Sequence, residues 1–247
     1  MKTALFLAAG YGSRIADMTS DPKCLLPING KALIDHHFEK ISNTGIKNIH
    51  MVLGFEAYKI EEHLKNRFPD LNISYSYNND FRRLGNTYSM KIGLENINTD
   101  VVIFDADLIY DQEILSDFIK NAPENAFLVG PSSIDDIECA KTMVDENDNV
   151  RLLIDKRAVS EEEKKKYSFR GEAIGIMQFS NTSRINILKA CELFFKEEAN
   201  LIKNWEHLFS KYLMDHDVKT YFIDSKNWIE IDNREDYEKA VSLFKGK

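Results

Sequence analysis

Two glycines and two basic residues near the start of the chain have the spacing of a site for a charged anion. Residues 3–9 form an apolar run of strand length, and Gly10 and Gly12 follow it directly. A strand that ends in a glycine-bearing loop turns several backbone N–H groups toward one point, where phosphate oxygens can approach closely. Arg14 adds a fork-shaped cation, and Lys23 adds a compact one. The stretch therefore predicts a loop that binds an anion with several charged oxygens.

This glycine pattern differs from the common nucleotide fingerprints. The dinucleotide motif needs a third glycine where this chain has Ile15, and the Walker loop with its G-K-[ST] ending is absent. Taken alone, the spacing also fits an ordinary tight turn. The neighbouring segments must therefore decide between the two interpretations.

Paired carboxylates occur in two places, and the first pair could hold a metal ion. Asp105 and Asp107 follow the strand-like run 100–104, and Glu230 and Asp232 lie on one face of a short extended segment near the end. Residues at i and i+2 of an extended segment share a face, and hard oxygen ligands suit Mg²⁺ bound with phosphates. The alternatives are solvated acids at a strand end, and Asp232 as the N-cap of the last helix.

The first 31 residues carry a resemblance to a known family. The pair L-A-A-G-x-G-S-R at 7–14 and D-P-K-C-L-L-P-I-N-G-K at 21–31 resembles the signature of the nucleotidyltransferase superfamily. Members of that superfamily couple a nucleoside triphosphate to a phosphorylated small molecule. Segments 84–107 and 228–240 are also similar to family segments, in the same order, so the resemblance spans the chain from end to end.

The resemblance implies roles for individual residues. Arg14 and Lys23 would be catalytic, and Asp107 and Asp232 would hold Mg²⁺. Asp105 would support the metal site or contact the substrate. The segment from Gly85 would read the base, although Asn86 alone also fits a helix cap, and Arg82 and Arg83 before it would reach phosphates or be solvated. The implied nucleotide-binding residues are Leu7, Ala8, Ala9, Gly10, Tyr11, Gly12, Ser13, Gly85, Asn86, Thr87 and Asp105.

Within the superfamily, the chain looks most like the phosphocholine and aminoethylphosphonate cytidylyltransferase branch. The short length, Asp105-Ala-Asp107 and the segment 228–232 carry this likeness. It implies transfer of CMP from CTP to a small phosphorylated amino compound, such as phosphocholine, aminoethylphosphonate or phosphoglutamine, with release of pyrophosphate. Such products decorate bacterial surface polymers. The alternatives are a sugar-1-phosphate nucleotidyltransferase that makes an NDP-sugar, and a nucleotide-sensing domain without turnover.

A cationic acceptor would need carboxylates or aromatic faces around it. Glu172, Trp205 and Glu230 are the substrate-binding candidates, with Glu206 and Trp228 beside them. For each residue the alternative is a packing or surface role.

The elements that would position these residues alternate between strand and helix. Ligands of the parallel sheets that such alternation builds lie at the carboxyl ends of the strands, where Gly10 and Asp105 fall. We therefore predict an α/β fold with three α-β-α layers and a mostly parallel, Rossmann-like sheet of the nucleotidyltransferase type. The expected strands are 49–53, 72–77 and 100–104, and the expected helices are 31–44, 56–68 and 86–94.

After residue 139 the pattern changes to a hairpin and a charged helix, which we assign to the acceptor side. We expect one domain over 1–247, with 1–130 binding the nucleotide and 131–247 binding the acceptor. The expected elements are a hairpin over 142–155 with its turn at 146–149, a solvated helix over 160–166, strands 173–179 and 218–223, and helices 183–199 and 234–244.

Composition excludes some function classes. The 247-residue chain has a net charge of −8, which argues against a nucleic-acid partner. Its six histidines lack ligand spacing, which argues against zinc. The three cysteines, Cys24, Cys139 and Cys191, predict a reduced, cytoplasmic protein, with Cys24 either packed or reactive beside Lys23. No apolar run is long enough for membrane insertion, and the sequence is compatible with a homo-oligomer.

Overall fold

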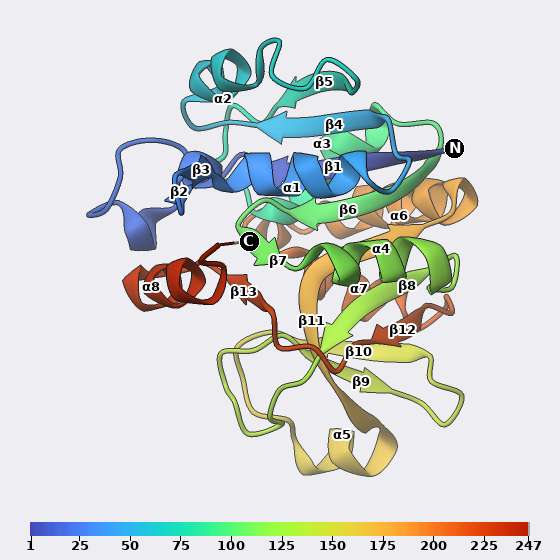
Figure 1. Cartoon of the computed structure of the whole chain (residues 1–247). Coiled ribbons are helices and arrows are strands. Elements are labelled where there is room, and N and C mark those ends of the chain that lie inside the picture. Colours follow the sequence, from blue (N-terminus) through green and yellow to red (C-terminus); the bar gives the residue numbers. More distant parts are fainter. Residues whose placement is uncertain (247) are drawn as a thin grey trace.

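One nine-stranded sheet runs through the protein, with helices on both of its faces (Figure 1). The structure is a computed structural model, and it describes residues 1–246. Four parallel strands form the amino-terminal part of the sheet in the order β6-β1-β4-β5. They are β1 (Lys2–Ala8), β4 (Asn48–Leu53), β5 (Asn72–Tyr77) and β6 (Asp100–Asp105).

One long strand joins the second half of the chain to this parallel sheet. The strand β11 (Ser168–Phe179) runs antiparallel to β6, β8 and β9, so the sheet becomes mixed beyond β6. The other strands here are β8 (Ala126–Gly130), β9 (Lys141–Val144), β10 (Val150–Ile154) and β12 (Lys219–Phe222). The predicted mostly parallel α/β sheet is confirmed, with an antiparallel extension in the second half of the chain.

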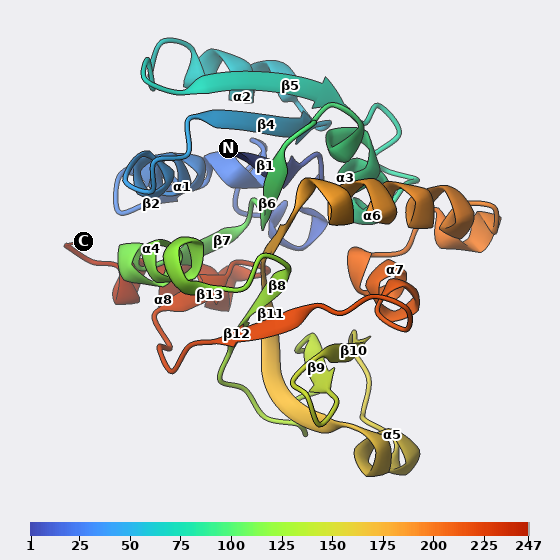
Figure 2. The same ribbon diagram turned by 90° about the vertical axis from the view of Figure 1, so that its right-hand side faces the viewer.

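The helices form the two outer layers (Figure 2). One face of the sheet is covered by α1 (Leu33–Ser42), α2 (Ala57–Leu64) and α4 (Gln112–Asn121). The other face is covered by α3 (Asn86–Glu95), α6 (Asn181–Phe194) and α7 (Trp205–Tyr212). The short α5 (Glu161–Lys166) lies beyond β9 and β10, and α8 (Arg234–Leu243) follows the last strand. None of the helices within residues 1–246 is both long and apolar enough to cross a bilayer.

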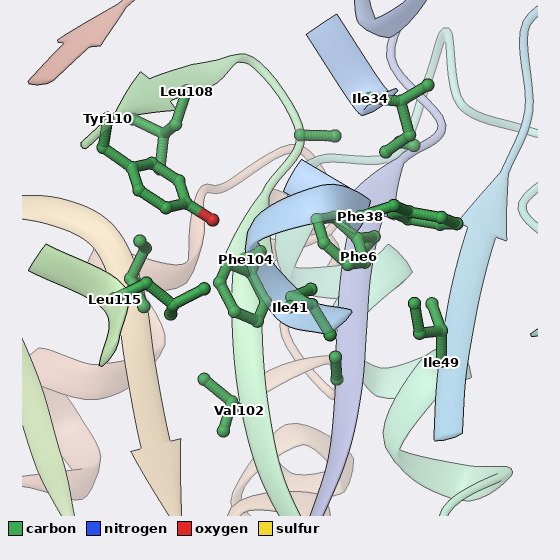
Figure 3. Close-up of a cluster of buried hydrophobic side chains, with 14 of the residues drawn as sticks. Phe6, Ile34, Phe38, Ile41, Ile49, Val102, Phe104, Leu108, Tyr110 and Leu115 are labelled. Carbon is green, nitrogen blue, oxygen red and sulfur yellow. The ribbon is translucent and has the colours of Figure 1, made fainter. Parts of the chain in front are cut away.

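The central strands are buried on both faces, which explains why they read as continuous apolar runs. Phe6 of β1 stacks on Phe104 of β6 with ring centroids 4.8 Å apart, and Phe38 and Ile41 of α1 pack over them (Figure 3). This core fixes β1 and β6 side by side. Their carboxyl ends, which carry the glycine loop and the first acid pair, are therefore adjacent.

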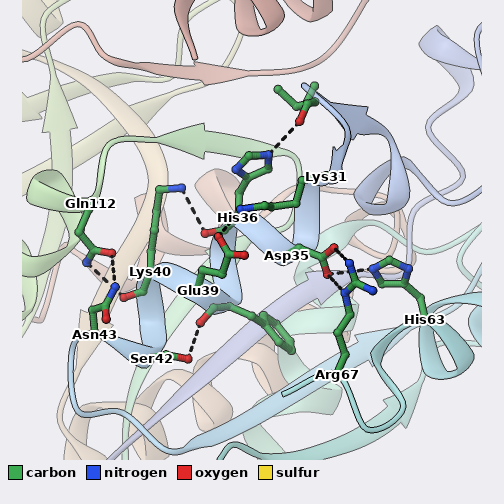
Figure 4. A network of polar contacts seen from close by, with 12 residues as sticks. Lys31, Asp35, His36, Glu39, Lys40, Ser42, Asn43, His63, Arg67 and Gln112 are labelled. Atoms are coloured by element: carbon green, nitrogen blue, oxygen red, sulfur yellow. Dashed lines mark hydrogen bonds and ion pairs between the residues drawn. The ribbon is translucent and has the colours of Figure 1, made fainter. Parts of the chain in front are cut away.

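A polar network joins α1 to the end of α2 on the same face. The buried Asp35 carboxylate lies 2.8 Å from His63 Nε2 and 2.9 Å from an Arg67 guanidinium nitrogen (Figure 4). A carboxylate that is 1% exposed requires such partners. The network has a structural role in holding α2 beside the amino-terminal half of the sheet.

Several element boundaries differ from the sequence prediction. Residues 31–32 pair with 27–28 as a small hairpin, so α1 starts at Leu33. The helix predicted to reach residue 199 ends at Phe194, whose carbonyl accepts a hydrogen bond from the Asn200 side chain at 2.8 Å. The helix predicted over 56–68 ends at Leu64. The strand β8 and the helix α7 were not predicted, whereas the 142–155 hairpin and the charged helix are confirmed.

Candidate active site

The glycine loop leaves the carboxyl end of β1 and brings its two cations together. Gly12 has φ +65°, and a Cβ at this position would lie 3.3 Å from the Lys23 Cβ. A residue without a side chain is therefore needed both for the left-handed backbone and for the approach of Lys23. Lys23 itself belongs to a short 3₁₀ turn over Lys23–Leu25, and its side chain is largely buried.

Two short strands bring Asp107 and the second acid pair into one cluster. The strands β7 (Leu108–Tyr110) and β13 (Trp228–Glu230) pair antiparallel, and the Ile231 N–H donates to the Asp107 carbonyl at 3.0 Å. This pairing places carboxylate oxygens of Asp107, Glu230 and Asp232 within 4.8 Å of one another. Residues more than 120 positions apart in the sequence thus form one acidic site.

Lys23 and Arg14 are bound to this acidic cluster. Lys23 Nζ lies 2.8 Å from Asp107 and 3.0 Å from Asp232, and Arg14 Nη1 lies 2.7 Å from Asp232. Burial alone would lower the pKa of Lys23, but the two carboxylates outweigh it and raise that pKa above its usual value. Desolvation likewise opposes ionisation of Asp232, yet Lys23 and Arg14 lower its pKa. Lys23 and Asp232 therefore stay charged together, whereas burial, with the charges of Asp107 and Asp232, raises the pKa of Glu230 well above its usual range.

Asp105 is set behind this cluster. Its carboxylate accepts a hydrogen bond from the Trp205 indole at 3.0 Å. A Cβ at Gly175, which has φ +72°, would lie 2.8 Å from the same carboxylate, so β11 needs glycine to pass Asp105. Burial, followed by the charges of Asp107 and Glu206, raises the pKa of Asp105 well above its usual range.

A cavity of about 360 Å³ opens beside the cluster and collects most of the predicted residues. The predicted residues that line it are Leu7, Ala8, Ala9, Gly10, Gly12, Ser13, Arg14, Lys23, Asn86, Asp105, Asp107, Glu172, Trp205, Glu230 and Asp232. The glycine loop and the acid pairs therefore face the same space as the proposed acceptor residues.

Three of the predicted nucleotide residues lie outside the cavity lining. Tyr11 packs its ring edge-on against Phe55, with the Arg82 guanidinium 5.0 Å from the ring centroid. Gly85 packs against the backbone of residues 202–203, and the fully buried Thr87 hydroxyl donates to the Lys203 carbonyl at 2.7 Å. These contacts hold the backbone of residues 202–203 against the start of α3.

The two capping alternatives are wrong. The N-cap of α3 is Gly85, and the Asn86 side-chain oxygen instead accepts a hydrogen bond from the Trp205 backbone N–H at 3.0 Å. The N-cap of α8 is Asn233, whose side chain accepts from the Asp236 N–H. Asp232 is thereby left available to the acidic cluster.

Two further candidates, Trp228 and Cys24, have packing roles. Trp228 lies against Gly130, where a Cβ would approach the indole nitrogen to 2.7 Å, and it is not part of the cavity lining. Cys24 is 4% exposed, and burial raises the pKa of its thiol to about 12. Since the thiolate is the reactive form, Cys24 is a packed residue rather than a nucleophile.

The sequence interpretation missed part of the cavity wall. Asp155 and Lys156 follow the β10 strand, and Glu138 precedes β9, and all three line the cavity. Their only sequence signal is their position at the open end of the predicted hairpin. Lys156 has a left-handed backbone with φ +46° and forms none of the ion pairs found among residues 1–246. Its positive charge acts on both Asp232 and Glu206.

Two carboxyl groups in this part of the cavity wall have raised pKa values. Burial, with the charge of Asp136, raises the pKa of Glu172 to about 7, and burial, with the charge of Asp155, raises that of Glu206 to about 7. The folded protein thus keeps the Glu206 proton to near pH 7, whereas the unfolded chain releases it near pH 4.5. The free energy of unfolding therefore falls as the pH rises through this window.

This linkage predicts that Glu206→Gln stabilises the protein at alkaline pH. The variant cannot ionise, so its free energy of unfolding at pH 8 should exceed that of the wild type by about 2 to 3 kcal/mol. At pH 4.5 the two proteins should be similar. Urea unfolding at both pH values measures the difference. Equal free energies of unfolding for the variant and the wild type at pH 8 would contradict the raised pKa of Glu206.

The acidic cluster has the donor chemistry for a hard divalent cation. Its three side chains supply carboxylate oxygens, which suit Mg²⁺. Asp107 Oδ1 is buried and has no hydrogen-bond partner among the described residues, so one oxygen remains free for a ligand. The residues present therefore fit the magnesium ion expected from the sequence, and Glu230 joins the two acids first expected to hold it.

The fold and the site together define the class of protein. The mixed α/β sheet is of the nucleotidyltransferase type, and it carries the glycine loop and the acid pairs around one cavity. The chain belongs to the family of MobA-like NTP transferase domains, whose profile matches residues 4–141.

Three relatives are informative. Over 96% of its length the chain is 26% identical to CTP:phosphoglutamine cytidylyltransferase of Campylobacter jejuni, and the match covers 98% of that protein. It is 27% identical over 122 residues to CMP-5'-(3-aminopropyl)phosphonate synthase of Streptomyces rubellomurinus, but spans only 19% of that protein. The structure of CTP:phosphocholine cytidylyltransferase (LicC) from Streptococcus pneumoniae has the same fold, with a TM-score of 0.75, 19% identity and 99% of both chains covered.

Proposed function

We propose that the protein is a Mg²⁺-dependent cytidylyltransferase that transfers CMP from CTP to a small phosphorylated amino compound and releases pyrophosphate. The observation that carries this proposal is the contact of Lys23 with both Asp107 and Asp232 at the end of the glycine loop. Such an arrangement joins a triphosphate loop to a metal-binding acid pair. The full-length similarity to a phosphoglutamine cytidylyltransferase supports CTP and an amino-type acceptor. Products of this class would serve surface-polymer synthesis.

In this proposal the two halves of a single domain face the cavity, and each half binds one substrate. Residues 1–130 would bind CTP through the loop 7–13, and residues 131–247 would bind the acceptor. Asn86 would contact the base from the cavity wall, and Asp105 would act through its neighbours in the acid cluster. Glu172 and Trp205 would form part of the acceptor wall.

The reaction is an in-line displacement in which the protein mainly positions and neutralises charge. An oxygen of the acceptor's phosphate or phosphonate bonds to the α-phosphorus of CTP. The bond from the α-phosphorus to the oxygen of the β-phosphate breaks, and pyrophosphate leaves. Lys23 would stabilise the negative charge on the transferring phosphoryl oxygens, and Arg14 would hold the distal phosphates. Asp107, Glu230 and Asp232 would hold Mg²⁺, which when bound neutralises charge on the phosphates.

Lys156 is the residue best placed to hold the acceptor's own phosphate. It is an exposed cation on the cavity wall, close enough to Asp232 for their charges to interact. We expect Lys156→Ala to raise the KM for the acceptor about 10-fold, the scale of one charged hydrogen bond, and to change the KM for CTP by less than about 2-fold. Initial-rate kinetics in both substrates measure this. The matched control is Lys165→Ala, an exposed lysine of α5. Equal changes in both KM values would refute the assignment.

Pyrophosphate release tests the proposed function. Each of CTP, UTP, ATP, GTP and dTTP is paired with Mg²⁺ and with phosphoethanolamine, aminoethylphosphonate, phosphocholine, phosphoglutamine or hexose 1-phosphates. Turnover with CTP and an amino-type acceptor is expected. Turnover confined to UTP or dTTP with a sugar phosphate would replace the proposal with an NDP-sugar synthase. Nucleotide binding without release in any pair would leave a nucleotide-sensing domain.

A further inference from the structure

The end of the cavity formed by the second half of the chain is strongly acidic. Its lining includes four acidic residues, Glu138, Asp155, Glu172 and Glu206. Among the described residues, Lys156 is the lysine at this end. Burial and neighbouring acids keep Glu172 and Glu206 partly protonated near pH 7, and a positively charged ligand would favour their ionised forms. An uncharged ligand would not favour those forms.

One of these carboxyl groups requires a hydrogen-bond donor. Glu206 lies in the first turn of α7 and is 8% exposed, and its Oε2 atom is buried with no hydrogen-bond partner among the described residues. The ionised carboxylate only accepts hydrogen bonds, and a buried acceptor without a partner is unfavourable, so a ligand that donates to Glu206 stabilises its ionised form on binding. The donor must carry a hydrogen atom on nitrogen or oxygen.

The described residues that line this end of the cavity present no open aromatic face. The lining residue Trp205 is 2% exposed, stacks on Phe127 with ring centroids 6.3 Å apart, and gives its indole N–H to Asp105. The other lining aromatic, Phe81, lies beside Gly54 at the glycine-loop end, with the Arg82 guanidinium 5.7 Å from its ring centroid. A quaternary ammonium group, which has no N–H, is held mainly by open aromatic faces.

We propose that the acceptor carries an ammonium group with at least one N–H, which donates to Glu206, and that a quaternary ammonium is selected against. This inference rests on the proposed cytidylyltransferase function and narrows its acceptor class. A sugar hydroxyl could also donate to Glu206, but it would not offset the charge of the surrounding acids. A trimethylated nitrogen would offset the charge and leave Glu206 without a donor. A protonated amine satisfies both requirements.

The test is a methylation series with the full-length protein, CTP and Mg²⁺. The acceptors are phosphoethanolamine, its N-methyl and N,N-dimethyl forms, phosphocholine, and aminoethylphosphonate with its trimethylated analogue. We expect kcat/KM to fall at least about 10-fold at the step that removes the last N–H, the scale of a lost charged hydrogen bond. In Glu206→Gln, kcat/KM should fall more for the acceptors with an N–H than for phosphocholine. The ratio of kcat/KM between these two kinds of acceptor should therefore shrink to within about 3-fold.

The control variant is Glu162→Gln, an exposed residue of α5, which should keep the wild-type discrimination. Thermal melting verifies that Glu206→Gln is folded. Equal or better use of phosphocholine by the wild type would overturn the inference while leaving the cytidylyltransferase function intact. An unchanged discrimination in Glu206→Gln would also overturn it. Turnover of CTP with none of these acceptors, but with hexose 1-phosphates, would refute both the inference and the proposed function.

Discussion

Replacing Lys23 by alanine should lower the turnover of nucleotidyl transfer by at least about 100-fold, the scale of losing one charge-stabilising group. Lys23 is largely buried and contacts both Asp107 and Asp232. Its ammonium group is therefore held at the junction of the phosphate loop and the acid cluster. The loss should appear in kcat more than in the KM for CTP, because the charge on the transferring oxygens is greatest in the transition state.

The Lys23→Ala variant also leaves two acids facing each other without their shared cation. Its folding must be verified by thermal melting before the kinetics are interpreted. The control is Lys189→Ala, an exposed lysine on α6, for which wild-type kinetics are expected. A folded Lys23→Ala protein that turns over at nearly the wild-type rate would remove Lys23 from the catalytic machinery.

Replacing Asp107 by asparagine should lower turnover by a similar factor, at least about 100-fold, and should raise the Mg²⁺ concentration needed for half-maximal activity. The side chain keeps its size but loses its charge. One of its oxygens contacts Lys23, and the other is buried with no hydrogen-bond partner among residues 1–246. Mg²⁺ titrations of activity, together with calorimetric titration of Mg²⁺ into the protein without nucleotide, separate the loss of metal affinity from the loss of turnover.

Asp70→Asn, an exposed aspartate, provides the matched control for Asp107→Asn. It should leave the Mg²⁺ requirement unchanged. If Asp107→Asn kept the wild-type Mg²⁺ requirement and lost only turnover, Asp107 would act on Lys23 and not on the metal.

The amino-terminal half could be predicted well because its signals are local. The runs 4–9 and 101–104 are apolar throughout, since both faces of these strands are buried. Helix and strand therefore alternate legibly, and the carboxyl-end rule placed Gly10 and Asp105 on the correct edge. The acid cluster also followed from short motifs, although the inclusion of Glu230 depended on the pairing of β13 with β7.

The parts that could not be predicted depend on contacts between distant segments. Gly85 and Thr87 looked like residues that contact a base, yet their surroundings are the backbone around Lys203, more than 100 positions away. The helix α7 has an apolar face at helical spacing, formed by Trp205, Leu208, Phe209 and Tyr212, but it is only 8 residues long, which is short for a helix to be recognised from its pattern. Lys156 and Glu206 reach the cavity only because β11 carries the second half of the chain back to β6.

The measurement that tests the central claim most directly follows the α-phosphate of CTP. The protein is incubated with Mg²⁺, CTP labelled at the α-phosphorus and phosphoethanolamine or aminoethylphosphonate, and the products are separated. The account predicts that the label appears in a cytidine product linked to the acceptor, with one pyrophosphate released for each molecule formed, and that chelation of Mg²⁺ abolishes both. Label that stays in CTP, or appears only as free CMP, would contradict the claim that this cavity performs nucleotidyl transfer to a phosphorylated amine.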